Sequence, residues 1–102
     1  RLGEDLDLAT ARVAAERAAE NLIAVLLDVV GDDASRIARV LMVRGYVNAA
    51  PDFALTHKVI DAASERIIAR FGEKGRHART SIGCATLPNG NAVTLEALAV
   101  LA

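Results

Sequence analysis

The chain of 102 residues suits a single domain, and its 53% hydrophobic and 25% charged residues exclude a disordered chain. Its formal net charge of −1 gives no global attraction for nucleic acid or an anionic membrane, and its single cysteine excludes an internal disulfide. No apolar stretch reaches the roughly 20 residues of a membrane span, so we predict one cytoplasmic domain over residues 1–102 with neither nucleic acid nor membrane as partner.

The first predicted element is a long helix that begins near Asp7 and ends at Gly31. Asp7 can cap the N-terminus, and Gly31 tolerates the left-handed conformation that ends many helices. Apolar residues at helical spacing predict the buried face: Val13, Ala14, Ala18, Leu22, Val25, Leu26 and Val29. The charged residues on the other side are expected to be solvated: Arg12, Glu16, Arg17 and Glu20.

A strand is predicted over residues 37–47, which are rich in β-branched residues and almost continuously apolar. This pattern is typical of a central strand covered on both faces. A second helix follows the break at Pro51 and ends at Gly72. Its apolar residues fall at intervals of three or four and predict that it lies on the sheet: Ile60, Ala63, Ile67 and Phe71.

Two further strands are predicted near residues 80–86 and 92–101, with the turn Pro88-Asn89-Gly90 between them, which favours a β-hairpin. The order helix, strand, helix, strand, strand indicates an α+β fold with both helices on one face of the sheet. A sheet of this size leaves helix surface and strand edges uncovered. We therefore expect additional strands, either from other subunits or from sequence before Arg1.

Arg79 stands at the mouth of the predicted hairpin, where a polar loop gives way to an apolar strand. A guanidinium can offer two parallel donors to a carboxylate, so Arg79 is a candidate anchor for a small anion. The alternative is an edge arginine that only solvates the end of a strand. Apart from Asp61, four residues after His57, no cysteine or acidic residue stands at metal-ligand spacing from His57 or His77, so we expect solvated loop histidines, no metal site and no cofactor.

Three features of the C-terminal third form one pattern: the pair Ala78-Arg79, the turn Leu87-Pro88 and the strand end Glu96-Ala97-Leu98-Ala99-Val100. This pattern resembles the RidA/YjgF family of reactive-intermediate (imine/enamine) deaminases, also described as endoribonuclease L-PSP proteins. The resemblance implies a chorismate-mutase-like fold, a homotrimer and ligand clefts between subunits. It also implies that the chain lacks the first strands and represents roughly the C-terminal two-thirds of the domain.

The resemblance also implies roles for individual residues. Arg79 matches the arginine that anchors the carboxylate of an imino acid or 2-keto acid, and Ser81 stands where many deaminases have cysteine. Asp61 stands where they have asparagine. Thr94 replaces the glutamate that positions the hydrolytic water, and its hydroxyl cannot act as a general base at neutral pH. Glu96 suits either the ligand site or an ion pair across the trimer.

These matches favour a RidA-like protein that binds small carboxylates, namely 2-imino or 2-keto acids. The alternative is an active 2-iminobutanoate/2-iminopropanoate-type deaminase, a hydrolase acting on C=N bonds. A remote alternative is an endoribonuclease or translation inhibitor. The sequence lacks the paired acid-base groups and the stacking aromatic residues that such a function would need. This alternative would rest on one basic cluster: Arg66, Arg70, Lys74, Arg76, His77 and Arg79.

Overall fold

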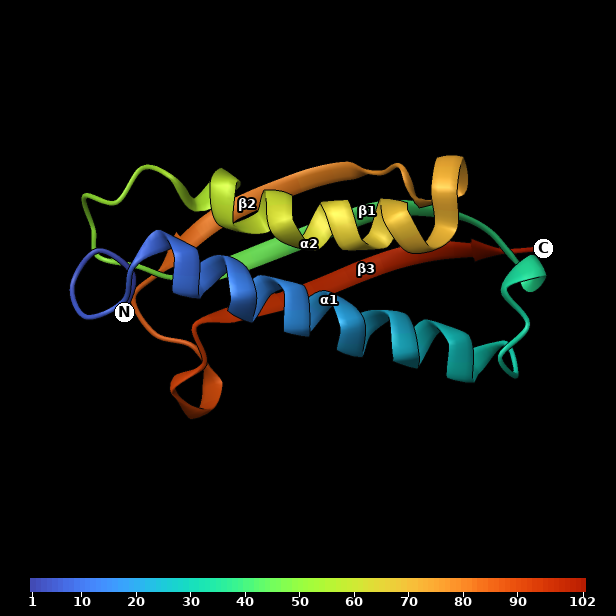
Figure 1. Cartoon of the computed structure of the whole chain (residues 1–102), viewed down its shortest axis with the longest axis horizontal. Coiled ribbons are helices and arrows are strands. Elements are labelled where there is room, and N and C mark those ends of the chain that lie inside the picture. Colours follow the sequence, from blue (N-terminus) through green and yellow to red (C-terminus); the bar gives the residue numbers. More distant parts are fainter.

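The computed structural model describes all residues, 1–102, as two helices packed on one face of a three-stranded sheet (Figure 1). The elements in chain order are α1 (Leu8–Val29), β1 (Ile37–Asn48), α2 (Thr56–Phe71), β2 (Ala78–Cys84) and β3 (Val93–Leu101). Short 3₁₀ turns lie at Ala34–Arg36, Gly72–Gly75 and Pro88–Gly90. The predicted α+β order and the placement of both helices on one face are confirmed.

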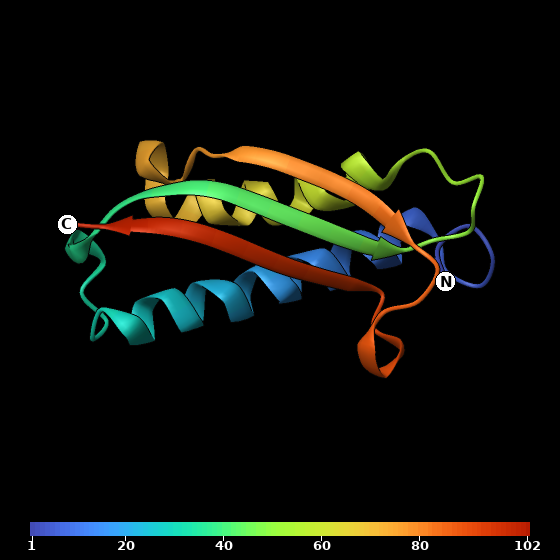
Figure 2. The same cartoon turned by 180° about the vertical axis from the view of Figure 1, so that it is seen from behind.

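β1 is the middle strand of the sheet, whose order is β2-β1-β3 (Figure 2). It runs parallel to β2 and antiparallel to β3, so β2 and β3 do not pair with each other. The predicted hairpin across Pro88–Gly90 is therefore wrong. Asn89 does take a positive φ of 57°, but the turn belongs to a loop that carries the chain past the end of β1. The apolar, 12-residue β1 gains backbone partners on both edges by this arrangement.

The N-terminus of α1 is capped as predicted. The Asp7 carboxylate accepts a hydrogen bond of 2.8 Å from the backbone N–H of Thr10, and this bond holds the pKa of Asp7 below its usual value. The helix ends at Val29, two residues before Gly31, which has a φ of +65°. Both ends of α1 therefore follow from local chemistry that the sequence displays.

The buried face of α1 differs from the predicted one. Ala11, Ala15 and Ala19 are fully buried, whereas Val13 and Val25 are exposed. The alanines recur every four residues, and their small side chains let α1 lie close to α2 and the sheet. Several predicted residues do pack against the core: Ala14, Ala18, Leu22 and Leu26. The buried face is therefore confirmed in part and is rotated toward the alanines.

β1 is covered on one face only, so its predicted burial on both faces is wrong for this chain. Val40, Val43 and Val47 are fully buried beneath the helices. Arg44 and Tyr46 alternate with them and lie on the face that carries no helix (Figure 2). Both helices occupy the same side of the sheet, which leaves this second face open.

α2 lies directly on β1 at Gly45. A Cβ atom added to Gly45 would lie 2.4 Å from Cδ1 of Ile60, so only glycine allows this approach. The predicted apolar face of α2 is confirmed, with Ile60 and Ile67 fully buried, and Gly72 ends the helix with a φ of +66°. No helix in the structure combines the length and apolarity that crossing a membrane requires.

Candidate functional site

Arg79 lies on β2 with its side chain directed toward α2. Its Nη2 forms an ion pair of 2.7 Å with Oδ1 of Asp61, and its Nη1 donates a hydrogen bond of 3.2 Å to Oγ of Ser64. Nη2 also donates to the backbone carbonyl of His57 at 3.4 Å. The side chain is 24% exposed, so solvent and solutes still reach it. Two predicted site residues, Arg79 and Asp61, are thus brought into direct contact.

His77 lies two residues before Arg79 and contacts the same turn of α2. Its Nε2 is 2.9 Å from Oγ of Ser64, and its Nδ1 is 2.6 Å from the carbonyl oxygen of Gly75. A carbonyl oxygen only accepts, so Nδ1 carries the proton and Nε2 of the neutral ring accepts from the Ser64 hydroxyl. His77 is half-buried and fully bonded, so its interpretation as a solvated loop histidine is wrong.

A cavity of about 250 Å³ opens beside these groups. We call it the Arg79 cavity; its lining residues are Ser64, Ile68, Arg76, His77 and Arg79. Arg76 is paired with Glu73 at 3.2 Å on the exposed outer rim. Two guanidinium groups, an imidazole and a hydroxyl around a small space form an environment suited to a small anion.

Ser81, the third predicted site residue on this side, follows Arg79 on the same face of β2. In the register of the sheet Arg79 stands beside Val43 and Ser81 beside Gly45, both of which face the helices. The Oγ of Ser81 is buried and has no hydrogen-bond partner. Arg79, Asp61 and Ser81 therefore lie on one side of the sheet, between β2 and α2.

Thr94 and Glu96 lie on the opposite, open face. In the register of the sheet Thr94 stands beside Tyr46 and Glu96 beside Arg44. Glu96 Oε1 accepts hydrogen bonds from the Tyr46 hydroxyl at 2.8 Å and from Arg44 Nη1 at 3.3 Å. These bonds lower the pKa of Glu96, and the bond to Glu96 raises the pKa of Tyr46. Within one chain the sheet therefore separates Thr94 and Glu96 from Arg79.

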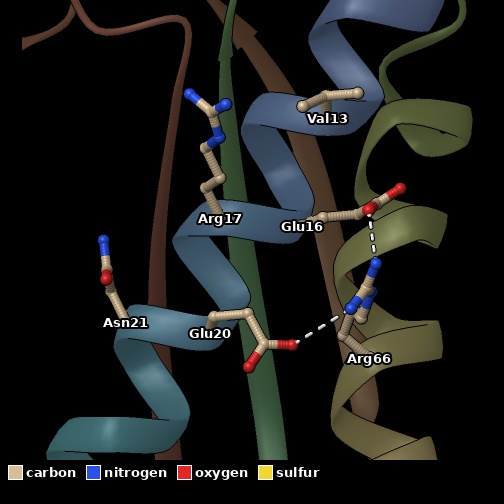
Figure 3. A pocket seen from close by; sticks show the side chains of 6 residues that line it. All are labelled: Val13, Glu16, Arg17, Glu20, Asn21 and Arg66. Carbon is tan, nitrogen blue, oxygen red and sulfur yellow. Dashed lines mark hydrogen bonds and ion pairs between the residues drawn. The ribbon is translucent and has the colours of Figure 1, made fainter.

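A larger hollow, of about 380 Å³, lies over the two helices (Figure 3). Arg66 of α2 bridges Glu16 at 2.7 Å and Glu20 at 3.4 Å, whereas Arg17 points away from them (Figure 3). The charged side of α1 is therefore partly an interhelical contact and not only a solvated face. Because the carboxylates of α1 already occupy Arg66, we assign this hollow to the packing of the helices.

Sequence reasoning missed Ser64. A usable signal is present, because Asp61 and Ser64 are three residues apart on a helix while His77 and Arg79 are two apart on an extended segment. Each spacing puts both residues of a pair on one face of its element. The face of α2 with Asp61 and Ser64 meets the face with His77 and Arg79 only at one rotation of α2 about its axis. The spacing of the residues does not determine this rotation.

The sequence and the fold of this chain are similar to those of several known proteins. The chain is 36% identical over 102 residues to Protein TCP17 of Trypanosoma cruzi. It superimposes with a TM-score of 0.96, at 39% identity, on the crystal structure of Atu1372 from Agrobacterium tumefaciens, a protein of unknown function. It superimposes with a TM-score of 0.91, at 28% identity, on a candidate endoribonuclease from Shewanella oneidensis.

The similarity covers nearly all of this chain but only part of each relative. The matches take in 99%, 99% and 97% of this chain, in the same order. The chain spans 63% of TCP17, 64% of Atu1372 and 65% of the Shewanella protein, less than two-thirds of their lengths. No protein-family model matches the chain.

Proposed function

Because this chain has the RidA/YjgF fold, we propose that it binds small carboxylates, namely 2-imino or 2-keto acids, through Arg79. The observation that carries the proposal is the half-buried guanidinium of Arg79 at a cavity of about 250 Å³. Arg76 and His77 line the same cavity, where Arg76 adds a second guanidinium group and His77 holds Ser64 by a hydrogen bond. A small carboxylate there would compete with Asp61 for Arg79.

We place this site in clefts between the subunits of a homotrimer. The support for an assembly is the open face of the sheet, on which Ile82 beside Tyr46 and Leu98 beside Met42 expose large apolar side chains. Exposed apolar surface of this kind favours association. Light scattering tests the assembly, since a monomer at assay concentrations would contradict it. A cytoplasmic location stays a prediction.

Binding ranks above imine hydrolysis for two reasons. Thr94, at the position of the water-orienting glutamate, offers a hydroxyl but no base at neutral pH. It also lies on the face of the sheet opposite Arg79, so hydrolysis would need a group from a second subunit. A 2-iminobutyrate hydrolysis assay separates the two functions, and turnover abolished by Arg79→Ala would favour the deaminase.

An endoribonuclease is the least supported function, although one structural relative is a candidate enzyme of that type. Its basic cluster is largely engaged inside the chain: Arg66 with Glu16 and Glu20, Arg76 with Glu73, Arg79 with Asp61, and Lys74 with the carbonyl of Ala34. Phosphate contacts need free cations and make affinity fall steeply with salt. RNA binding that weakens in this way would revive this function.

The binding proposal is tested by thermal denaturation with 2-oxobutyrate. We expect the ligand to raise the Tm of the wild-type chain, because a ligand that binds only the folded state stabilises it. Arg79→Ala should abolish the shift. Arg39→Ala is the matched control, since Arg39 is an exposed arginine on β1 outside the cavity. An equal shift in wild type and Arg79→Ala would overturn the assignment of the site.

A further inference from the structure

We propose that Ser64 and His77 form a nucleophile and base pair that hydrolyses small activated esters, an activity beyond carboxylate binding at Arg79. The Ser64 Oγ lies 2.9 Å from Nε2 of His77, within reach for direct proton transfer. The hydrogen bond from Nδ1 of His77 to Gly75 fixes the tautomer whose Nε2 is free to accept. A nucleophile, a base and a group that orients the base are the general signature of such sites.

The Ser64 hydroxyl is contacted from two sides with opposite roles. His77 accepts its proton, while Nη1 of Arg79 donates to its oxygen at 3.2 Å. A cation beside the oxygen stabilises the negative charge that develops as the proton leaves. His77 can therefore take the proton of Ser64, and Arg79 can stabilise the charge that remains on its oxygen.

The pair is also accessible. Ser64 and His77 both line the Arg79 cavity, so a substrate or a water molecule in the cavity can reach both side chains. Ile68 supplies the apolar lining, and Arg76 and Arg79 add two guanidinium groups to it, which are donors of the kind that stabilise a developing oxyanion. At about 250 Å³ the cavity has room for a small ester such as an acetyl ester.

The reaction balances without a cofactor. Ser64 Oγ attacks the ester carbonyl as its proton passes to His77 Nε2, and the tetrahedral intermediate expels the alcohol, which takes that proton. A water molecule then attacks the acyl-serine as His77 accepts one of its protons. Collapse of the second intermediate releases the acid and returns the proton to Ser64, so that ester and water give acid and alcohol.

We test this activity with p-nitrophenyl acetate and a fluorophosphonate probe on the full chain. Wild type should release p-nitrophenol above the buffer rate and form a phosphonate adduct that maps to Ser64. Ser64→Ala should lose both, and His77→Gln should slow turnover by about 100-fold or more, since glutamine cannot take the proton. Circular dichroism melts check that both variants are folded.

Matched controls are Ser35→Ala and His57→Gln, because neither residue lines the cavity: the Ser35 hydroxyl bonds Asp33, and Arg79 bonds the backbone carbonyl of His57, which the substitution keeps. Both controls should keep wild-type rates. Two results would overturn the proposal: a folded Ser64→Ala variant with unchanged turnover, or wild type with neither turnover nor an adduct at Ser64. A wild-type chain that shows the 2-oxobutyrate shift but neither turnover nor an adduct would overturn this activity alone, so failure here is distinguishable from failure of carboxylate binding.

Discussion

Oδ1 of Asp61 lies 2.7 Å from Nη2 of Arg79, so α2 supplies an internal carboxylate to the arginine that β2 presents. The contact joins residues 61 and 79, which lie on different elements of the fold. It places a carboxylate where we expect a ligand carboxylate to bind. The affinity of the site therefore depends on competition between the two.

Asp61→Asn should strengthen 2-oxobutyrate binding, because the neutral amide competes less well for Arg79. The Asp61 carboxylate is 43% exposed, and ion pairs at such positions are worth about 0.2–1 kcal/mol. We therefore expect a gain in affinity of up to about fivefold by calorimetry. Glu65→Gln is the matched control, since Glu65 pairs with Arg12 and not with Arg79. Weaker binding by Asp61→Asn would instead make Asp61 a group that orients Arg79.

Tyr46→Phe should remove a stabilising interaction that depends on pH. The bond from Tyr46 lowers the pKa of Glu96 below its ordinary 4.5, so its contribution is present above that pH and is lost as pH falls through the lower, folded value. The pKa of Tyr46 is raised above 10.0, so the contribution is present below that pH and is lost as pH rises through the raised value.

The measurement is the difference in Tm between wild type and Tyr46→Phe as a function of pH. We expect it to be constant near neutral pH and to shrink in strong acid as Glu96 is protonated. Glu96 is 52% exposed and Tyr46 is half-buried, so the effect should be small and reduced by salt. A difference that persists unchanged in acid would show that Tyr46 acts through packing alone.

Gly45→Ala should destabilise the fold because the new methyl group would overlap Ile60, whose Cγ1 would lie at 2.5 Å. Overpacking of this kind costs about 1–3 kcal/mol, measurable by urea denaturation. Ile60→Ala in the same chain should relieve part of the cost, giving a nonadditive double-mutant cycle. Gly83→Ala is the control, since its Cβ would meet Thr56 at an ordinary 3.5 Å; equal losses at both glycines would contradict the explanation.

Asp7→Ala should lower the free energy of unfolding by about 1 kcal/mol, because the N–H of Thr10 loses its capping acceptor. Asp7→Asn keeps an acceptor oxygen at the same position and should stay close to wild type. Urea denaturation of the two variants compares them directly. Similar losses in both would mean that the charge of Asp7, and not the hydrogen bond, stabilises α1.

The parts of the fold that the sequence predicts are those decided locally. The cap at Asp7 and the end of α2 at Gly72 depend on neighbouring residues and are confirmed. The pairing of strands depends on residues far apart in the sequence. The turn at Pro88–Gly90 therefore predicted a hairpin between β2 and β3, whereas β1 lies between these two strands. The buried face of α1 was predicted only in part: Ala14, Ala18, Leu22 and Leu26 pack against the core, but the fully buried alanines Ala11, Ala15 and Ala19 were not identified.

The candidate site was predictable in part for the same reason. The resemblance to the RidA/YjgF family made Arg79 and Asp61 candidate ligand-binding residues. The structure brings these two residues into contact. Ser64 and His77 carry no motif, and their contact depends on how α2 is rotated against β2. Whether Thr94 ever meets Arg79 depends on other subunits, which the sequence of one chain does not describe.

The central position of β1 has a consequence for amide exchange with solvent. β1 is bonded along both edges, whereas β2 and β3 are each bonded to β1 along one edge only. In an isolated chain we therefore expect the amides of β1 to exchange slowly and those of β2 and β3 to alternate between slow and fast. Strands from another subunit would slow the fast set, so the exchange pattern itself reports whether the sheet continues beyond one chain.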